Sequence, residues 1–329
     1  KNRNMYKKIF LLMILFLLSI FCARTAYCAP GRLGDILFQG TSVKAEGMGN
    51  TEEVVVDNSS TAYLNPSMLS YLTDYEIIAS YGKIMDNKIT GISGIIPIKN
   101  VMTIAGYYMQ SKTADLEAYD INGDLKGSFS IMQRAGGLGV GFPIEEYFSL
   151  GVNVKALESL VDDTQHDFYG IDIGFLSVLK VFNGVYFGGT IYNIWQDKRG
   201  ETDDKFRENM RLGIGLRPLG DNLLLAADYE FPKEIYGGIE YSAYLASMLL
   251  SLRAGINLDH VSGGIGIMYD SLGVDYSVSF QSIGLLHKIS VTLKTSEKPQ
   301  EKANTPANAV NEPAQPQPAE NQPTGEENK

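Results

Sequence analysis

The amino-acid sequence predicts an all-β fold, a closed antiparallel transmembrane β-barrel of about 14 strands. Three observations predict it. Residues 74–294 form a succession of segments of about ten residues with period-two alternation, separated by Gly, Asn, Asp and Pro turn signals. Apolar side chains occupy one face of these segments, and charged or very small side chains occupy the other. An export signal precedes them, and a closed barrel leaves no backbone group unpaired in lipid.

The N-terminus has the organisation of an export signal. Basic Lys7 and Lys8 precede the apolar run 9–21, and the small-residue stretch 23–29 supplies a cleavage site. The apolar run is shorter than the ~20 residues that a spanning helix needs. Residues 1–28 are therefore expected to be a secretory signal peptide that exports the chain through the Sec pathway.

Cleavage after Cys28 would remove both cysteines, Cys22 and Cys28, so the exported chain is expected to have no disulfide. Cleavage would also remove five basic residues and take the formal net charge from -10 to -15. Nucleic acid is an unsuitable partner for so acidic a chain.

Residues 29–73 differ from everything that follows. The stretch VVDNSSTAYLNPSMLSYL (55–72) is polar and rich in turn residues, and it neither alternates nor forms a good helix pattern. Pro66 fixes its own φ and biases Asn65 away from helix. Because about 14 strands enclose a lumen that side chains fill poorly, we expect this segment to be a hatch or plug within or beneath the barrel, with Asn65 hydrogen-bonded to the wall.

The barrel is expected to span residues 74–294. Its strands are predicted at 74–83, 88–98, 100–111, 127–142, 146–157, 166–179, 183–195, 208–217, 221–231, 234–243, 248–258, 261–270, 272–281 and 286–294. The longest connections, 112–126, 158–165 and 196–207, follow odd strands, so both termini should face the periplasm. Asn122-Gly123 is a hairpin signal, which predicts that the third and fourth strands continue as a ribbon beyond the bilayer.

A soluble β-sandwich is the alternative, because its strands alternate as well. Two details favour the membrane barrel. The polar face is rich in Gly as well as in charged residues, which suits a crowded barrel interior. The segments are regular and close to the ~9 to 11 residues that cross a bilayer with tilt.

Residues 295–329 change abruptly to Pro, Gln, Asn, Glu, Ala and Lys, without an aromatic residue. Such a composition cannot bury enough apolar surface to offset its ordering entropy. We expect a disordered periplasmic tail, for which a periplasmic partner is one role and a dispensable extension is the other.

Charged residues recur at inward positions of neighbouring strands. Opposite charges there would brace the barrel across strands, and a polar channel lining is the alternative. The set comprises Arg211, Arg217, Asp228, Glu230, Glu240, Arg253 and Asp275.

No motif predicts catalysis, a metal site or a cofactor. The histidines, His166, His260 and His287, have no metal-ligand spacing. The stretch GGLGVG (136–141) opens no helix and lacks the lysine of a phosphate loop, so its glycines are interpreted as strand glycines.

The N-terminal segment carries a family signature. It combines GMG, an acidic residue with small residues, and an element similar to YxNPAxL, in which Ser67 replaces the common Ala. Together with SLGVNVKAL (149–157) and SGGIGIMYDSLGVDYSVS (262–279), this resembles the PorV/PorQ family of the FadL-like outer-membrane superfamily. The matching positions are Gly47, Met48, Gly49, Asp57, Ser59, Ser60, Ala62, Tyr63, Asn65, Pro66 and Leu69.

The resemblance implies a fourteen-stranded outer-membrane barrel with an N-terminal hatch. PorV-like members serve type IX secretion and receive cargo proteins, whereas FadL-type members move hydrophobic compounds that leave sideways through the wall. The leading hypothesis is a PorV-like barrel with a transport or secretion-accessory role, with secreted cargo proteins and membrane lipid as partners. The alternatives are a FadL-like uptake channel for a hydrophobic ligand and a structural or adhesive barrel with a plugged lumen.

Overall fold

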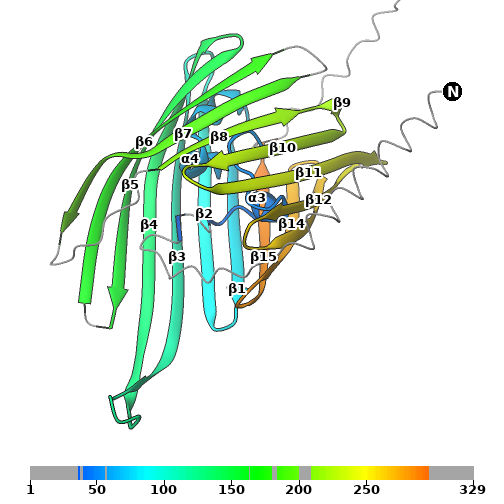
Figure 1. Ribbon diagram of the computed structural model, residues 1–329. Coiled ribbons are helices and arrows are strands. Elements are labelled where there is room, and N and C mark those ends of the chain that lie inside the picture. Colours follow the sequence, from blue (N-terminus) through cyan, green and yellow to red (C-terminus); the bar gives the residue numbers. More distant parts are fainter. Residues whose placement is uncertain are drawn as a thin grey trace, which may run out of the picture. The chain divides into compact units, whose positions relative to one another are not determined.

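The computed structural model describes residues 36–37, 40–55, 58–162, 164–179, 184–199 and 209–295. Fourteen of the described strands close into one antiparallel barrel, in which β1 pairs with β15 as well as with β2 (Figure 1). These strands are β1 (Glu76–Ile84), β2 (Asn87–Ile98), β3 (Met102–Tyr119), β4 (Leu125–Glu145), β5 (Phe148–Val161), β6 (Thr164–Leu179), β7 (Val185–Arg199), β8 (Asn209–Leu216), β10 (Leu223–Glu230), β11 (Glu234–Leu245), β12 (Met248–Asn257), β13 (Val261–Tyr269), β14 (Leu272–Gln281) and β15 (Gly284–Lys294). The short β9 (Pro218–Asp221) lies outside the closed ring. The predicted all-β closed antiparallel barrel is confirmed.

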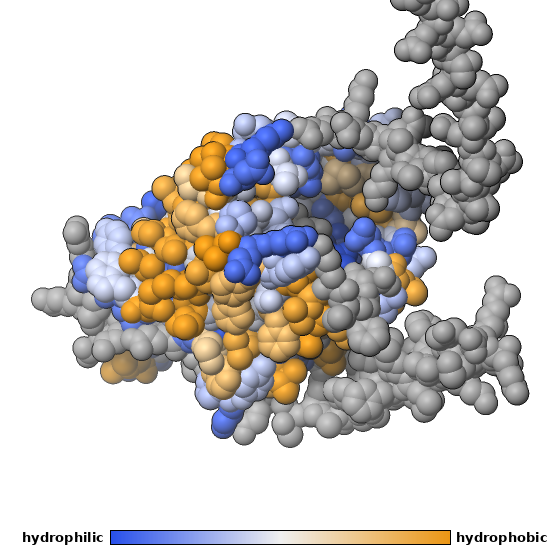
Figure 2. All heavy atoms as spheres, turned by 90° about the horizontal axis from the view of Figure 1, so that it is seen from above, coloured by the Kyte–Doolittle hydropathy of each residue, from blue (hydrophilic) through white to orange (hydrophobic). Residues whose placement is uncertain are grey.

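Alternation along each strand decides which face a side chain occupies. On β15, Ile289, Val291 and Leu293 are exposed on the outside, whereas Lys288 and Thr292 are buried inside. The same division recurs around the barrel, and hydrophobic side chains cover broad areas of its outer surface (Figure 2). An apolar exterior on a closed sheet is what contact with lipid acyl chains requires.

The third and fourth strands of the barrel are longer than predicted. β3 and β4 continue to a turn at 120–124, where Asp120 accepts hydrogen bonds from the amides of Asn122 (2.9 Å) and Asp124 (3.0 Å). Figure 1 shows this hairpin projecting beyond the other strands. The expected continuation of these two strands as a ribbon is confirmed, and its position beyond the bilayer stays a prediction.

The predicted long connection at 158–165 is wrong. β5 and β6 pair continuously as far as Val161 and Thr164, so a tight turn joins them. The charged side chains Glu158 and Asp167 lie opposite each other in this ladder. They made the sequence resemble a loop, although pairing continues through them.

The N-terminal segment, residues 36–72, contains the short helices α3 (Val43–Gly47) and α4 (Thr61–Leu64) and the 3-10 helix η1 (Pro66–Tyr71). Ser42 begins α3 by accepting a hydrogen bond from the amide of Ala45, as an N-cap residue does. Asn65 begins η1 in the same way, by accepting from the amide of Ser67. None of the helices in the described residues is both long and apolar enough to cross a bilayer.

This segment packs against the wall of the barrel. Helix α3 contacts β12 to β15, and η1 contacts β3 to β6. Most of its described side chains are buried, and many belong to hydrophobic clusters shared with the inward face of the strands. The predicted signal peptide (1–28), residues 29–35 and the tail from 296 onward lie outside the described residues.

Two wall glycines allow the segment to approach the strands closely. A Cβ at Gly255 would overlap the backbone of Met48 and Gly49, and a Cβ at Gly151 would overlap the backbone between Pro66 and Ser67. Only glycine has room at such positions. The glycines on the inward face of the strands are therefore part of the seat of the N-terminal segment.

Candidate functional site

The glycine-containing part of the predicted signature, Gly47 to Gly49, lies where the segment meets β12 and β13. The amide of Gly49 donates to Ser262 Oγ at 2.9 Å, and Gly49 adopts φ +71°, a left-handed conformation that favours glycine. Gly47 faces Gly264, so that two backbones meet without side chains between them.

Asn65 belongs to the second part of the signature, Tyr63 to Leu69, and is fully buried. Its Nδ2 donates to the carbonyl oxygens of Glu53 (3.0 Å) and Phe175 on β6 (3.2 Å), and its Oδ1 accepts from the amide and hydroxyl of Ser67 (3.2 and 2.6 Å). The predicted hydrogen bond between Asn65 and the wall is confirmed.

The remaining signature residues fix the segment around Asn65. The hydroxyl of Tyr63 accepts from the amide of Thr41 at 2.9 Å, and its ring packs 5.2 Å from that of Tyr107. Leu69 is fully buried and lies where a Cβ on Gly141 of β4 would come to 2.8 Å from it. Asp57, the acidic residue of the predicted signature, lies outside the described residues.

One group of inward charges lies on β11, β12 and β14. Arg253 contacts Glu240 through Nε at 2.6 Å and Asp275 through Nη1 at 2.5 Å. Lys44 of α3 also binds Glu240, at 3.1 Å. Gly266 on the intervening β13 leaves the space through which Arg253 reaches Asp275. These ion pairs join the N-terminal segment to the wall as well as one strand to another.

A second group surrounds Arg211 on β8. Its Nη1 lies 2.7 Å from Glu52 Oε2, its Nη2 donates to the carbonyl of Asn50 at 2.7 Å, and its Nε lies 3.5 Å from Asp228 on β10. Asp228 Oδ2 accepts from the amides of Glu52 (2.6 Å) and Glu53 (3.1 Å). Burial raises the pKa of Glu52 to about 8, although the guanidinium of Arg211 opposes the shift.

Glu53 has a different environment. Its carboxyl group lies 2.9 Å from the hydroxyl of Thr190 and 3.1 Å from that of Tyr192, both on β7. Burial, reinforced by the nearby carboxyl of Asp228, raises the pKa of Glu53 well above its usual range. Burial of this kind favours the protonated form of the carboxyl group.

The third group fixes α3 to β15 and β13. Glu46 lies 2.7 Å from Lys288 Nζ and 3.5 Å from His260 Nε2, and all three side chains are buried. Burial alone would raise the pKa of Glu46, but Lys288 and His260 together hold it below its usual range. This carboxylate is therefore ionised at neutral pH.

Arg217 is the exception among the predicted network residues. It lies at the end of the β8 segment, where its Nη1 is 3.6 Å from the exposed carboxylate of Asp221 and its guanidinium lies 5.5 Å from the Tyr186 ring. Its ion pair is with Asp221 and not with the Arg211 or Arg253 group, although it lines the same cavity as Glu240, Arg253 and Asp275.

A row of apolar side chains crosses the inner wall on β3 to β6, next to buried polar residues such as Lys155 and Asp172. Met109, Ala135, Leu157 and Phe168 pair in register across β3, β4, β5 and β6, and each is at most 2% exposed. We call these four residues the apolar row. Ile36 and Leu37 of the N-terminal segment belong to the same hydrophobic cluster as the row. Inward positions of membrane barrels are usually polar, so the row is a departure that needs a reason.

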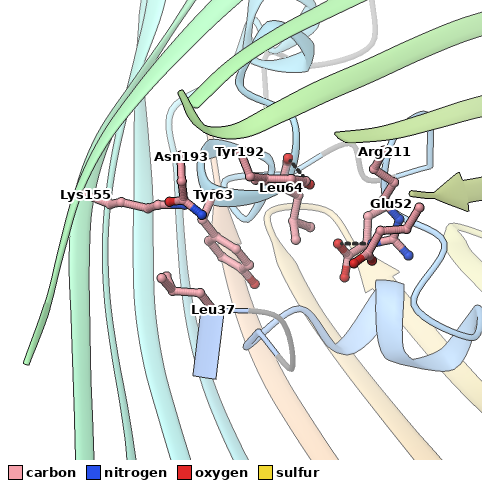
Figure 3. A pocket seen from close by; sticks show the side chains of 9 residues that line it. Leu37, Glu52, Tyr63, Leu64, Lys155, Tyr192, Asn193 and Arg211 are labelled. Atoms are coloured by element: carbon pink, nitrogen blue, oxygen red, sulfur yellow. Dashed lines mark hydrogen bonds and ion pairs between the residues drawn. The ribbon is translucent and has the colours of Figure 1, made fainter. Parts of the chain in front are cut away.

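A small cavity of about 10 Å³ lies between Leu37 and Leu64 of the segment and Tyr192 and Asn193 of β7, and charged residues such as Glu52, Lys155 and Arg211 also line it (Figure 3). It has room for about one water molecule. The β6–β7 ladder is irregular at Asn193. Ile171 pairs with Trp195 and Ile173 pairs with Ile191, so β7 has extra residues between the two pairs, and Asn193 adopts φ 57°.

A larger cavity of about 700 Å³ opens at the end of the barrel where β1 begins and β15 finishes. Both signs of charge line it, which makes it a polar vestibule. Its lining includes Lys44, Arg217, Glu240, Arg253, Asp275 and Lys294.

Sequence reasoning missed the charged residues of the segment itself and several of their partners on the wall. Lys155, for example, occupies an inward position of β5 and binds Asp172 at 2.8 Å. The alternation of β5 places Lys155 inside, and that signal was present in the sequence. The contacts of Glu46, Glu52 and Glu53 carried no such signal, because the segment has no periodicity to orient them.

No protein-family model matches the chain, and no curated protein matches it. Several solved structures do match the chain. The toluene transporter TodX of Pseudomonas putida superposes with a TM-score of 0.54 at 10% identity, covering 82% of this chain and 99% of that one. The toluene transporter TbuX of Ralstonia pickettii gives 0.54 at 9% identity, covering 78% and 98%. A FadL homologue of Pseudomonas aeruginosa gives 0.52 at 9% identity, covering 82% and 99%. The chain therefore has the fold of FadL-like channels.

Proposed function

We propose that this protein is an outer-membrane channel that passes small hydrophobic molecules, with the N-terminal segment as its plug. The apolar row carries the proposal. A channel for polar solutes gains nothing from an apolar inner wall, whereas a hydrophobic passenger needs one to leave water. Ile36 and Leu37 of the N-terminal segment belong to the same hydrophobic cluster as the apolar row.

The fold supports the same proposal. Solved structures with TM-scores above 0.5 include monoaromatic hydrocarbon channels, toluene transporters and a FadL homologue. They favour the uptake channel over the PorV-like secretion role that the sequence resemblance put first. Secreted cargo proteins receive no support from these comparisons.

The proposed route begins at the apolar row. Lys44 and Asn58 of the segment line the polar vestibule of about 700 Å³, whereas its Ile36 and Leu37 belong to the hydrophobic cluster of the row. Such a polar cavity suits a hydrophobic passenger poorly. The resemblance to FadL-type channels implies an exit through the wall. The irregular β6–β7 ladder beside the row, at Asn193, is the position that we propose for it.

Uptake measurements test the proposal. Cells that carry the full chain should take up radiolabelled toluene faster than cells without it. Leu157→Asn, which places an amide in the apolar row, should reduce this uptake about tenfold or more, since one buried polar group costs a few kcal/mol without a partner.

The matched control is Ser159→Asn, which adds the same side chain at the next inward position of β5, where a polar residue is already buried. It should leave toluene uptake near the wild-type rate. Equal uptake by Leu157→Asn and the wild type would contradict the proposal. No uptake of toluene by any of the three proteins would favour a structural barrel.

A further inference from the structure

We propose that residues 50–53 form a pH-sensitive latch, which holds the N-terminal segment to β8 and β10 at low pH and releases it as the pH rises. The latch consists of the contacts of Arg211 and Asp228 with this stretch of the segment. It concerns how the segment is held, whatever the passenger, so it can fail or stand independently of the uptake proposal.

Arg211 and Asp228 bind both side-chain and backbone groups of residues 50–53. Arg211 binds the carboxyl of Glu52 and the carbonyl of Asn50, while Asp228 accepts both the Glu52 and the Glu53 amides. All of these groups come from two neighbouring strands and one four-residue stretch. Loss of this interface would free the stretch as a unit.

Charge is unbalanced within the latch. In the described part of the chain, Arg211 is the cation paired with Glu52 and Asp228, and it also attracts the carboxyl of Glu53, while Lys288 adds a weaker attraction to Glu52. Three ionised carboxylates around one guanidinium would leave two uncompensated negative charges in a buried site, which is strongly unfavourable. The closed latch must therefore bind protons that the released segment, in water, gives up.

The hydrogen bonds of Glu53 show where one such proton lies. The hydroxyls of Thr190 and Tyr192 lie within hydrogen-bond distance of both Glu53 and the carbonyl of Leu64, at 2.8 to 3.2 Å. Each hydroxyl has a single proton and so donates to one acceptor at a time. A proton on the Glu53 carboxyl adds a third donor to this group of hydrogen bonds.

Neighbouring cations have carboxylate partners of their own. Lys155 binds Asp172 at 2.8 Å, and Lys288 binds Glu46 at 2.7 Å. Among the described residues, the other titratable groups around the latch are Tyr63, Tyr192, Glu230, Glu234 and Tyr236, of which Glu230 contacts Asn209 and Tyr236. None of these five brings a positive charge to it.

The anchor of α3 contrasts with the latch. Glu46 there is a single carboxylate between Lys288 and His260. Its one negative charge is paired with Lys288, so this anchor has no excess of carboxylates that requires a proton. The segment should therefore loosen at 50–53 while α3 remains in place.

The sign and size of the effect follow from proton linkage. Glu52 has a pKa of about 8 in the latch and its ordinary value, 4.5, when released. The ratio of latched to released protein should fall by up to tenfold for each pH unit between these values, from Glu52 alone.

Hydrogen exchange on the full chain in detergent micelles, corrected for the intrinsic rate at each pH, tests the proposal. Between pH 6 and 8 the protection of residues 50–55 should fall at least tenfold relative to that of residues 43–47. In the variant Glu52→Gln/Glu53→Gln, whose amides mimic the protonated acids, the ratio of the two protections should stay constant.

Two results would overturn the proposal. One is a constant ratio of the two protections in the wild type, and the other is an equal fall in the wild type and the double variant. If the double variant does not assemble, the wild-type comparison between 50–55 and 43–47 still decides.

Discussion

The carboxylate of Glu46 on α3 lies 2.7 Å from the ammonium group of Lys288 on β15, although 242 positions separate them in the chain. Both side chains are almost completely buried. A buried pair of this kind depends on both partners, because either one alone would be an uncompensated charge. It fixes the N-terminal segment to the last strand of the barrel.

Lys288→Met should destabilise the protein at pH 7 by about 3–5 kcal/mol, the usual cost of breaking a buried ion pair. In the wild type the pKa of Glu46 is lowered, so its ionised form stabilises above pH 4.5 and this contribution is lost as the pH falls through the lowered pKa. Without Lys288 the pKa of Glu46 should rise, and acidification should then stabilise the variant. Thermal unfolding midpoints at pH 4 and 7 measure both effects.

The control for this prediction is Lys288→Met/Glu46→Gln, which removes the buried charge together with its partner. Its midpoint should vary less with pH than that of the single variant. An equal loss of stability by Lys288→Met at pH 4 and 7 would show that packing, and not charge, explains the effect.

Asn65→Ala should loosen the segment around η1. It removes two donors and one acceptor, and leaves the carbonyls of Glu53 and Phe175 without this partner. The expected cost is about 1–3 kcal/mol for each buried group left unsatisfied. Limited proteolysis should cleave within 58–72 at least tenfold faster than in the wild type.

Ser70→Ala is the matched control, because the Ser70 hydroxyl donates to Ser67 within the same helix and is only partly buried. Its cleavage rate should stay within about twofold of the wild type. Equal rates for the two variants would mean that Asn65 does not hold the segment.

How much of this fold could be predicted depended on periodicity. Each predicted barrel strand corresponds to a described one, because alternation with period two marks a strand that has an apolar and a polar side. Inward charges such as Arg253 and Asp275 followed from the same pattern. Glu52 and Glu53 could not be paired with Arg211 and Asp228, because a non-periodic segment and a strand far along the chain meet only in the folded barrel.

Gly255→Ala should displace the segment from β12. A Cβ there would overlap backbone atoms of Met48 and Gly49, which cannot move aside as a flexible side chain can. If the segment plugs the lumen as proposed, its displacement should raise the single-channel conductance in planar bilayers. Gly263→Ala, whose Cβ would meet its nearest atom at 3.6 Å, should conduct like the wild type.

Equal conductance of Gly255→Ala and Gly263→Ala would mean that the segment does not depend on this contact. Failure of Gly255→Ala to assemble, with normal assembly of Gly263→Ala, would instead show that the seat of the segment is needed for folding. Heat-modified mobility on gels distinguishes the assembled barrel from the unfolded chain.

Phe168→Ala should widen the passage at the apolar row. The phenyl ring is 1% exposed at the end of the row on β6, and its removal costs about 3–5 kcal/mol of stability. If hydrophobic molecules pass here, uptake of a bulky passenger such as a naphthalene derivative should rise relative to toluene. Phe175→Ala removes the same ring from the same strand at a position of opposite parity, where the side chain is half-buried. In Phe175→Ala the ratio of naphthalene-derivative uptake to toluene uptake should match that of the wild type. An unchanged ratio in Phe168→Ala would mean that hydrophobic molecules pass elsewhere in the barrel.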